Sequence, residues 1–158
     1  MVSMNVDVLN IEGRKILYIK NKTEKYIKLL NIKNIEDIVV KFVKRIPKCT
    51  KDVMGMYDLE YVTRPNKKPS NKHIVYIRKD LITNRYALLT TLMHELVHLK
   101  QYATGKMNWV RYQLRSENIF IFWKKKRMGE FCDLDYYSSP WEIEAREVAK
   151  KMWREGKL

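Results

Sequence analysis

Two histidines four residues apart, in a leucine-rich stretch, constrain this chain more than any other feature. They are His94 and His98 in the run 91–99, and Glu95 stands between them. On an α-helix, residues four apart lie about one turn apart on the same face, so both imidazoles can reach a single metal ion. The run therefore predicts a metal-binding helix.

The residues around the motif have the periodicity of a helix that lies between a core and a cleft. If residues 85–103 are helical, six apolar side chains share one broad face: Leu88, Leu89, Leu92, Met93, Leu96 and Leu99. The histidines and Glu95 then occupy the opposite side. Asp80 or Thr83 is expected to cap the start of the helix, and Gly105 to end it. The alternative is a helix whose histidines have no chemical role.

The types of these residues favour a catalytic zinc ion. Zinc binds histidine nitrogen, and it lowers the pKa of a bound water to about 7. A carboxylate beside the histidines can accept a proton from that water, as in zinc peptidases. The motif therefore predicts Zn²⁺ as the cofactor, His94 and His98 as metal ligands and Glu95 as the general base.

A catalytic zinc needs a third protein ligand, and the last helical segment, residues 140–154, offers the best candidates. Ser139 and Glu142 have the spacing of a capping box, which would give Glu142 a local role. Glu144 also borders the apolar stripe of this helix and is therefore the expected ligand, with Glu142 as the alternative. Three further carboxylates are weaker candidates: Asp133, Asp135 and Glu147.

The segments before residue 85 alternate in the manner of short strands. Strands are expected at 6–9, 15–19, 38–46, 55–61 and 73–78, and a short helix at 23–30. For 38–46, a helix capped by Asn34 is the alternative. His73 is expected to be a strand or surface residue and not a ligand. The prediction is an α+β protein of one domain, residues 1–158, whose small, mainly antiparallel sheet packs on the metal-binding helix.

Composition narrows the expected setting of the protein. The chain has no apolar run of about 18 residues, which predicts no membrane span, and its first residues lack the pattern of a secretory signal. Two cysteines, Cys49 and Cys132, are too few for a disulfide scaffold, and Cys132 has no partner cysteine at zinc-site spacing. Together these features predict a cytoplasmic protein.

The formal net charge of +14 is large for 158 residues and predicts an acidic partner, with nucleic acid the first candidate. Four consecutive cations are the expected contact, with Trp109, Tyr112 and Trp123 nearby: Lys124, Lys125, Lys126 and Arg127. The alternative is a solvated, lysine-rich surface without a partner. The charge supports a second hypothesis, a nucleic-acid-binding protein with a structural or vestigial zinc site. A combination of both, a protease delivered to DNA-bound protein, also fits the sequence.

Two motifs together, residues 91–105 and the stretch Tyr-Tyr-x-x-Pro-Trp-Glu-Ile-Glu-Ala at 136–145, resemble small SprT-like zinc metallopeptidases of the zincin type. Many of these are encoded by phages and other viruses. The resemblance implies a minimal zincin fold, hydrolysis of peptide bonds in a protein or peptide substrate, and a viral protein acting inside its host cell. In related short zincins a glutamate before an alanine on a later helix completes the metal site, which again indicates Glu144.

Peptide hydrolysis also needs a donor that stabilises the developing oxyanion. Tyr136, Tyr137 and Arg146 are the candidates in this chain. Packing and loop anchoring are the alternative roles for the two tyrosines.

Overall fold

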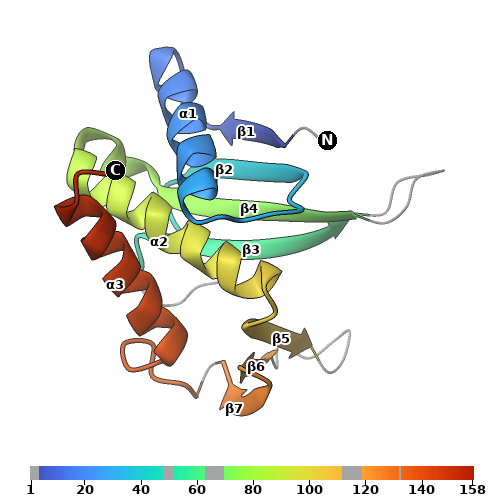
Figure 1. The fold of residues 1–158 in the computed structure, drawn as a ribbon. Helices are drawn as coiled ribbons and strands as arrows, with labels where there is room; N and C mark the ends of the chain where they lie inside the picture. Colours follow the sequence, from blue (N-terminus) through green and yellow to red (C-terminus); the bar gives the residue numbers. More distant parts are fainter. Residues whose placement is uncertain (1–3, 48–51, 63–69, 112–118, 132) are drawn as a thin grey trace.

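The computed structural model describes residues 4–47, 52–62, 70–111, 119–131 and 133–158. Within these residues the chain forms a four-stranded sheet, a three-stranded sheet and three α-helices (Figure 1). An α+β class is therefore confirmed. Cys49, Tyr112 and Cys132 lie outside the described residues. No helix of the described part is long and apolar enough to cross a membrane.

The first sheet joins a β–α–β unit to a hairpin. Its strands are β1 (Asn5–Leu9), β2 (Asp37–Val43), β3 (Gly55–Val62) and β4 (Ser70–Arg78), in the order β1-β2-β4-β3. β2 pairs in parallel with both β1 and β4, and only β3 and β4 pair antiparallel. The prediction of a mainly antiparallel sheet was therefore wrong for the sheet that precedes the helix of His94 and His98. Parallel neighbours need a long crossover between them, and a helix supplies it here.

That crossover is α1 (Arg14–Leu29), which replaces the strand predicted at 15–19 and extends the helix predicted at 23–30. Its buried residues recur every three or four positions: Ile19, Thr23, Tyr26 and Ile27. The apolar side chains that suggested a strand, Ile16, Leu17 and Tyr18, are exposed. The helical period of the buried side chains thus overrides the local strand pattern.

A 3₁₀ turn (Lys79–Thr83) leads into α2 (Arg85–Ala103), whose bounds match the prediction. The cap is Asn84, and not Asp80 or Thr83, because the Asn84 side chain accepts a hydrogen bond from the backbone N–H of Ala87 at 3.1 Å. Asp80 instead accepts hydrogen bonds from Arg78. After the helix, Gly105 adopts a φ of 70°, the left-handed conformation that commonly ends helices.

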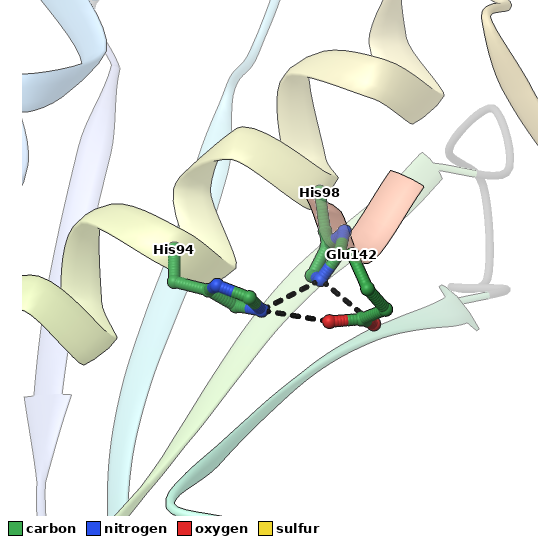
Figure 2. Close-up of side chains that lie close together, drawn as sticks. All are labelled: His94, His98 and Glu142. Carbon is green, nitrogen blue, oxygen red and sulfur yellow. Dashed lines mark hydrogen bonds and ion pairs between the residues drawn. The ribbon is translucent and has the colours of Figure 1, made fainter. Parts of the chain in front are cut away.

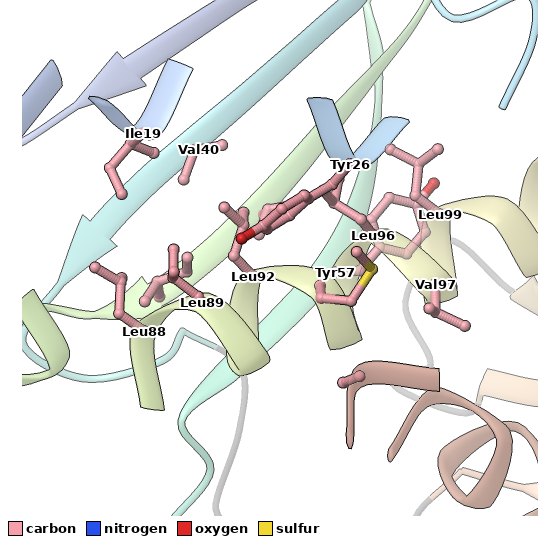
Figure 3. Close-up of a cluster of buried hydrophobic side chains, with 14 of the residues drawn as sticks. Ile19, Tyr26, Val40, Tyr57, Leu88, Leu89, Leu92, Leu96, Val97 and Leu99 are labelled. Carbon is pink, nitrogen blue, oxygen red and sulfur yellow. The ribbon is translucent and has the colours of Figure 1, made fainter. Parts of the chain in front are cut away.

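One continuous core lies between α1, α2 and the first sheet (Figure 3). Leu89, Leu92, Leu96 and Leu99 of α2 are fully buried in it. Burial of each such side chain contributes about 1.5–3 kcal/mol, so α2 is firmly held. The helix that carries the histidines is therefore a rigid support.

The second half of the chain places α3 (Pro140–Arg154) along α2, on the side away from the first sheet (Figure 1). Its bounds also match the prediction. A second sheet, β5 (Met107–Arg111), β6 (Ile119–Trp123) and β7 (Lys126–Glu130), was not predicted. Trp141 at the start of α3 packs against Met107 and Ile121 of this sheet. The small sheet thereby fixes the first turn of α3 beside α2.

Candidate metal centre

The two histidines of α2 and one glutamate of α3 converge on a single point (Figure 2). His94 Nε2 lies 3.0 Å from Glu142 Oε2, and His98 Nε2 lies 3.2 Å from Glu142 Oε1. The two Nε2 atoms are 3.1 Å apart. The packing of α3 on α2 therefore brings Glu142 to His94, although the two residues are 48 positions apart in the sequence.

These separations suit a single small cation. Zinc holds nitrogen and oxygen ligands at about 2.0–2.2 Å, which at tetrahedral angles places neighbouring ligand atoms about 3.3 Å apart. The two Nε2 atoms are 3.1 Å apart, and each lies 3.0 or 3.2 Å from its nearer Glu142 oxygen, Oε2 for His94 and Oε1 for His98, so the separations are close to that value. Two histidines and one carboxylate are also a donor set that catalytic zinc sites use, with a fourth position left for water or substrate. The residues present therefore fit a zinc ion.

Electrostatics in the cluster favour positive charge at the point where the three side chains meet. Burial alone would raise the pKa of Glu142, but hydrogen bonds and charge from His94 and His98 outweigh it and lower that pKa to about 2. Burial alone would lower the pKa of His98, but the adjacent Glu142 carboxylate raises it to about 9. A carboxylate that stays ionised between two imidazoles attracts a cation strongly in this poorly solvated place.

Glu95 lies directly beside the cluster and is only 3% exposed. Burial raises its pKa, while the nearby His94 and His98 and a hydrogen bond from the backbone N–H of Tyr57 act in the opposite direction. β3 approaches Glu95 closely at Gly55, where a Cβ atom would stand 2.8 Å from Glu95 Oε1. The absence of a side chain at Gly55 therefore gives the Glu95 carboxylate its space.

Glu144, the expected third ligand, lies outside the cluster. Its carboxylate forms an ion pair with Lys106 Nζ at the start of the second sheet. Glu142 lies beside the histidines, and the predicted capping box does not form: the Ser139 hydroxyl donates to the backbone carbonyl of Asp135. Ser139 still stands at the cap position of α3, but without a side-chain cap hydrogen bond. The structure thus brings the alternative candidate, Glu142, and not Glu144, to the two histidines.

The weaker carboxylate candidates also stay outside the cluster. Asp135 accepts hydrogen bonds from the Tyr137 backbone and from the Ser138 hydroxyl in the turn before α3. Asp133 and Glu147 are exposed. Neither the turn nor the outer face of α3 therefore supplies a ligand in the described part of the chain.

Of the three candidates for an oxyanion donor, Tyr136 lies closest to the chemistry. Its hydroxyl is hydrogen-bonded to Glu142, and burial, followed by the charges of Glu142 and Glu95, raises its pKa. Tyr137 is 74% exposed, and its backbone carbonyl accepts a hydrogen bond from Arg146. The cation of Arg146 stacks over the Tyr137 ring. Tyr137 and Arg146 therefore brace the loop, while Tyr136 faces the site.

His73 lies in β4, in agreement with the strand prediction, but it is buried and not at the surface. It is 6% exposed, and its Nδ1 is 2.8 Å from the hydroxyl of Tyr57. Burial lowers its pKa, which favours the neutral ring.

The four consecutive cations, Lys124, Lys125, Lys126 and Arg127, form the exposed end of the β6–β7 hairpin and are called the basic turn below. Arg127 lies over the half-buried ring of Phe120, 4.2 Å from the ring centroid. Trp109 packs on Tyr102 at 5.0 Å, and Trp123 packs on Trp141 at 6.1 Å between ring centroids. The tryptophans expected to stack on nucleic acid therefore serve the protein's own packing.

Gln101 is a residue of the site that the sequence analysis missed. Its Oε1 is 2.9 Å from His98 Nδ1, and its Nε2 donates to the backbone carbonyl of Trp141 at 3.0 Å. It is 1% exposed. Its position three residues after His98, on the same helix face, is a signal from which the contact could have been predicted.

No protein-family model, no curated protein and no solved structure matches this chain. The case for its function therefore depends on the geometry of His94, His98, Glu142 and Glu95, and on the chemistry that such a donor set supports.

Proposed function

We propose that this chain is a zinc-dependent metallopeptidase whose ion is held by His94, His98 and Glu142. The observation that carries the proposal is the convergence of these three donors, 3.0–3.2 Å apart, beside a buried glutamate. A zinc ion bound there would activate a water molecule and polarise the carbonyl of a scissile peptide bond.

Residues of the chain would then carry out the proton transfers. Glu95 accepts a proton from the attacking water as its oxygen bonds to the carbonyl carbon. Glu95 delivers that proton to the amide nitrogen as the carbon–nitrogen bond breaks, which leaves a carboxylic acid and an amine. Transfer of the water's second proton from the acid to the amine then gives a carboxylate and an ammonium group. Tyr136, hydrogen-bonded to Glu142 at the edge of the site, is the nearest candidate for a donor to the oxyanion.

The number of ligands supports catalysis over a purely structural role. Structural zinc sites are closed by four protein ligands, whereas the cluster in the described part of the chain has three. Glu95 is also buried directly beside the cluster. A structural zinc ion would need no such carboxylate, because it has no water to deprotonate. Both features support the peptidase over the alternative, a nucleic-acid-binding protein with a structural zinc.

The first experiment measures metal content and hydrolysis together. Protein purified without chelators should contain about one zinc per chain by elemental analysis, and His94→Ala should lose most of it. Glu95→Gln should keep the zinc and the fold but lose cleavage of a protein or peptide library, because glutamine keeps the shape and removes the base. General-base catalysis typically contributes about 10²–10⁴-fold, so a loss in that range is expected.

Two results would contradict the proposal, one its zinc site and the other its general base. Native protein without metal would remove the zinc site altogether. Zinc-loaded protein in which Glu95→Gln cleaves as fast as the wild type would leave the site but remove Glu95 as the base.

A further inference from the structure

Gln101 joins the two helices that carry the metal-binding side chains. It lies on α2, contacts the ring of His98, and donates to the carbonyl of Trp141, the residue directly before Glu142 on α3. Gln101 and Glu142 are both buried, as is Trp141. A buried polar side chain between two ligand-bearing elements can act on both ligands at once.

The partners of Gln101 fix which way its amide is turned. A backbone carbonyl has no hydrogen to give, so the atom of Gln101 that faces Trp141 O must be the donating Nε2. The amide oxygen, Oε1, is then the atom that faces His98. The usual ambiguity between the two ends of a glutamine amide is therefore resolved by chemistry.

The same argument fixes the proton on His98. Oε1 can only accept a hydrogen bond, so His98 Nδ1 must carry the hydrogen that it donates across 2.9 Å. With Nδ1 protonated, the neutral ring has its lone pair on Nε2. His98 Nε2 is the atom that faces His94 and Glu142. The hydrogen bond from Gln101 to the Trp141 carbonyl orients the Gln101 amide, and that amide selects the His98 tautomer that metal binding requires.

We propose that Gln101 is the positioning residue of the metal centre. It holds His98 with Nδ1 protonated and Nε2 directed at the ion, and it ties the first turn of α3 to α2 so that Glu142 meets the histidines. This inference rests on the proposed metal binding but not on the proposed hydrolysis. Partners of this kind typically change metal affinity by about 10–100-fold.

The wild-type protein allows a direct test that needs no variant. The chain has three histidines, so two-bond ¹H–¹⁵N spectra of the zinc-loaded protein contain few side-chain signals to assign. The expected result is a protonated Nδ1 and a metal-bound Nε2 on His98. A metal-bound Nδ1 on His98 would overturn the inference.

Variants test whether Gln101 matters for affinity. Gln101→Met keeps the length of the side chain and removes both hydrogen bonds, so its zinc dissociation constant should rise by about 10–100-fold. Gln101→Glu keeps an acceptor facing His98 Nδ1 in either protonation state but, when ionised, cannot donate to the Trp141 carbonyl, so it should restore part of the affinity lost in Gln101→Met. The spectrum of bound Co²⁺ should be altered in Gln101→Met and native-like in Gln101→Glu.

Tyr57→Phe is the matched control, because it removes a buried hydrogen bond to Nδ1 of a histidine outside the centre, His73. It should lower the melting temperature while zinc affinity stays within about twofold of the wild type. Equal zinc affinity in folded Gln101→Met and wild type would overturn the inference and leave the metal centre standing. A wild type that binds no metal would overturn both. Tight zinc binding without hydrolysis would remove only the peptidase.

Discussion

Among single residues, Glu142 and Glu144 give the sharpest test of the proposed centre. Glu142→Gln removes the carboxylate beside His94 and His98. It should weaken zinc binding by more than about 100-fold, which is a larger loss than that expected when a residue hydrogen-bonded to a metal ligand is replaced. Glu144→Gln loses only a half-exposed ion pair with Lys106, which is worth about 0–1 kcal/mol of stability. Competitive zinc titrations and melting curves of both variants provide the measurement.

The reverse order of affinities would move the ligand back to Glu144. Equal and native affinities in both variants would mean that the carboxylate of α3 is not a ligand, and that His94 and His98 bind metal without it.

The same residues show how far a sequence can identify a site. The spacing of His94, Glu95 and His98 was sufficient to predict that both histidines lie on one face of a helix with Glu95 beside them, because residues on one helix have a fixed geometry. Glu144 was expected beside the histidines in place of Glu142 because Ser139 and Glu142 match a local capping pattern, and a local pattern says nothing of a partner helix. Only the approach of α3 to α2 shows that Glu142 faces the histidines.

At the level of elements, the contact between β3 and α2 controls the space around Glu95. A Cβ at position 55 would stand 2.7 Å from Thr91 Cγ2 and 2.8 Å from Glu95 Oε1, closer than packed atoms tolerate. Gly55→Ala should therefore displace Glu95 and cost about 1–3 kcal/mol of stability. Hydrolysis should fall in this variant while zinc content stays at the native level.

A second substitution separates the two contacts of that variant. Thr91→Ser removes Cγ2, so Gly55→Ala with Thr91→Ser should regain part of the melting temperature but not the activity, because the contact with Glu95 remains. Native rates of hydrolysis in Gly55→Ala alone would show that the position of Glu95 does not depend on this contact.

Periodicity alone did not decide which helices were predicted. α1 has a clear helical period of buried side chains and was still partly misassigned, whereas α2 is buried around most of its surface and was predicted, as was α3, with the correct bounds. The segment 15–19 was misassigned because five residues rich in apolar side chains suit a strand as well as a helix. β5, β6 and β7 were missed because their pairing is a property of the second sheet and not of any one segment.

At the scale of the whole molecule, the net charge of +14 is the feature that the proposed metal centre does not explain. The basic turn concentrates four exposed cations at one end of the second sheet. Lys124 and Lys125 have φ angles of 49° and 68°, in the left-handed region where hairpins of this kind usually have asparagine and glycine. The geometry of the hairpin alone therefore does not account for lysine at these positions.

If this charge binds nucleic acid, affinity should fall steeply with salt, because each neutralised phosphate releases condensed counterions. Replacing Lys124, Lys125, Lys126 and Arg127 with glutamine should weaken binding and reduce the slope of log affinity against log salt. The slope should fall by about 0.9 for each duplex phosphate that the variant no longer neutralises. Fluorescence anisotropy with single- and double-stranded DNA and RNA provides the measurement, and zinc content should not change.

A matched control separates the basic turn from net charge. Four cations of α1 are also exposed: Arg14, Lys15, Lys25 and Lys28. Their replacement by glutamine also removes three lysines and one arginine, so the net charge changes by the same amount. A local interface at the hairpin requires the first variant to lose much more affinity than the second. Equal losses would mean that binding follows overall charge, since a diffuse field acts without a defined contact. No binding by the wild type in low salt would assign the lysines to the solvated surface and leave the metal centre as the functional feature of the chain.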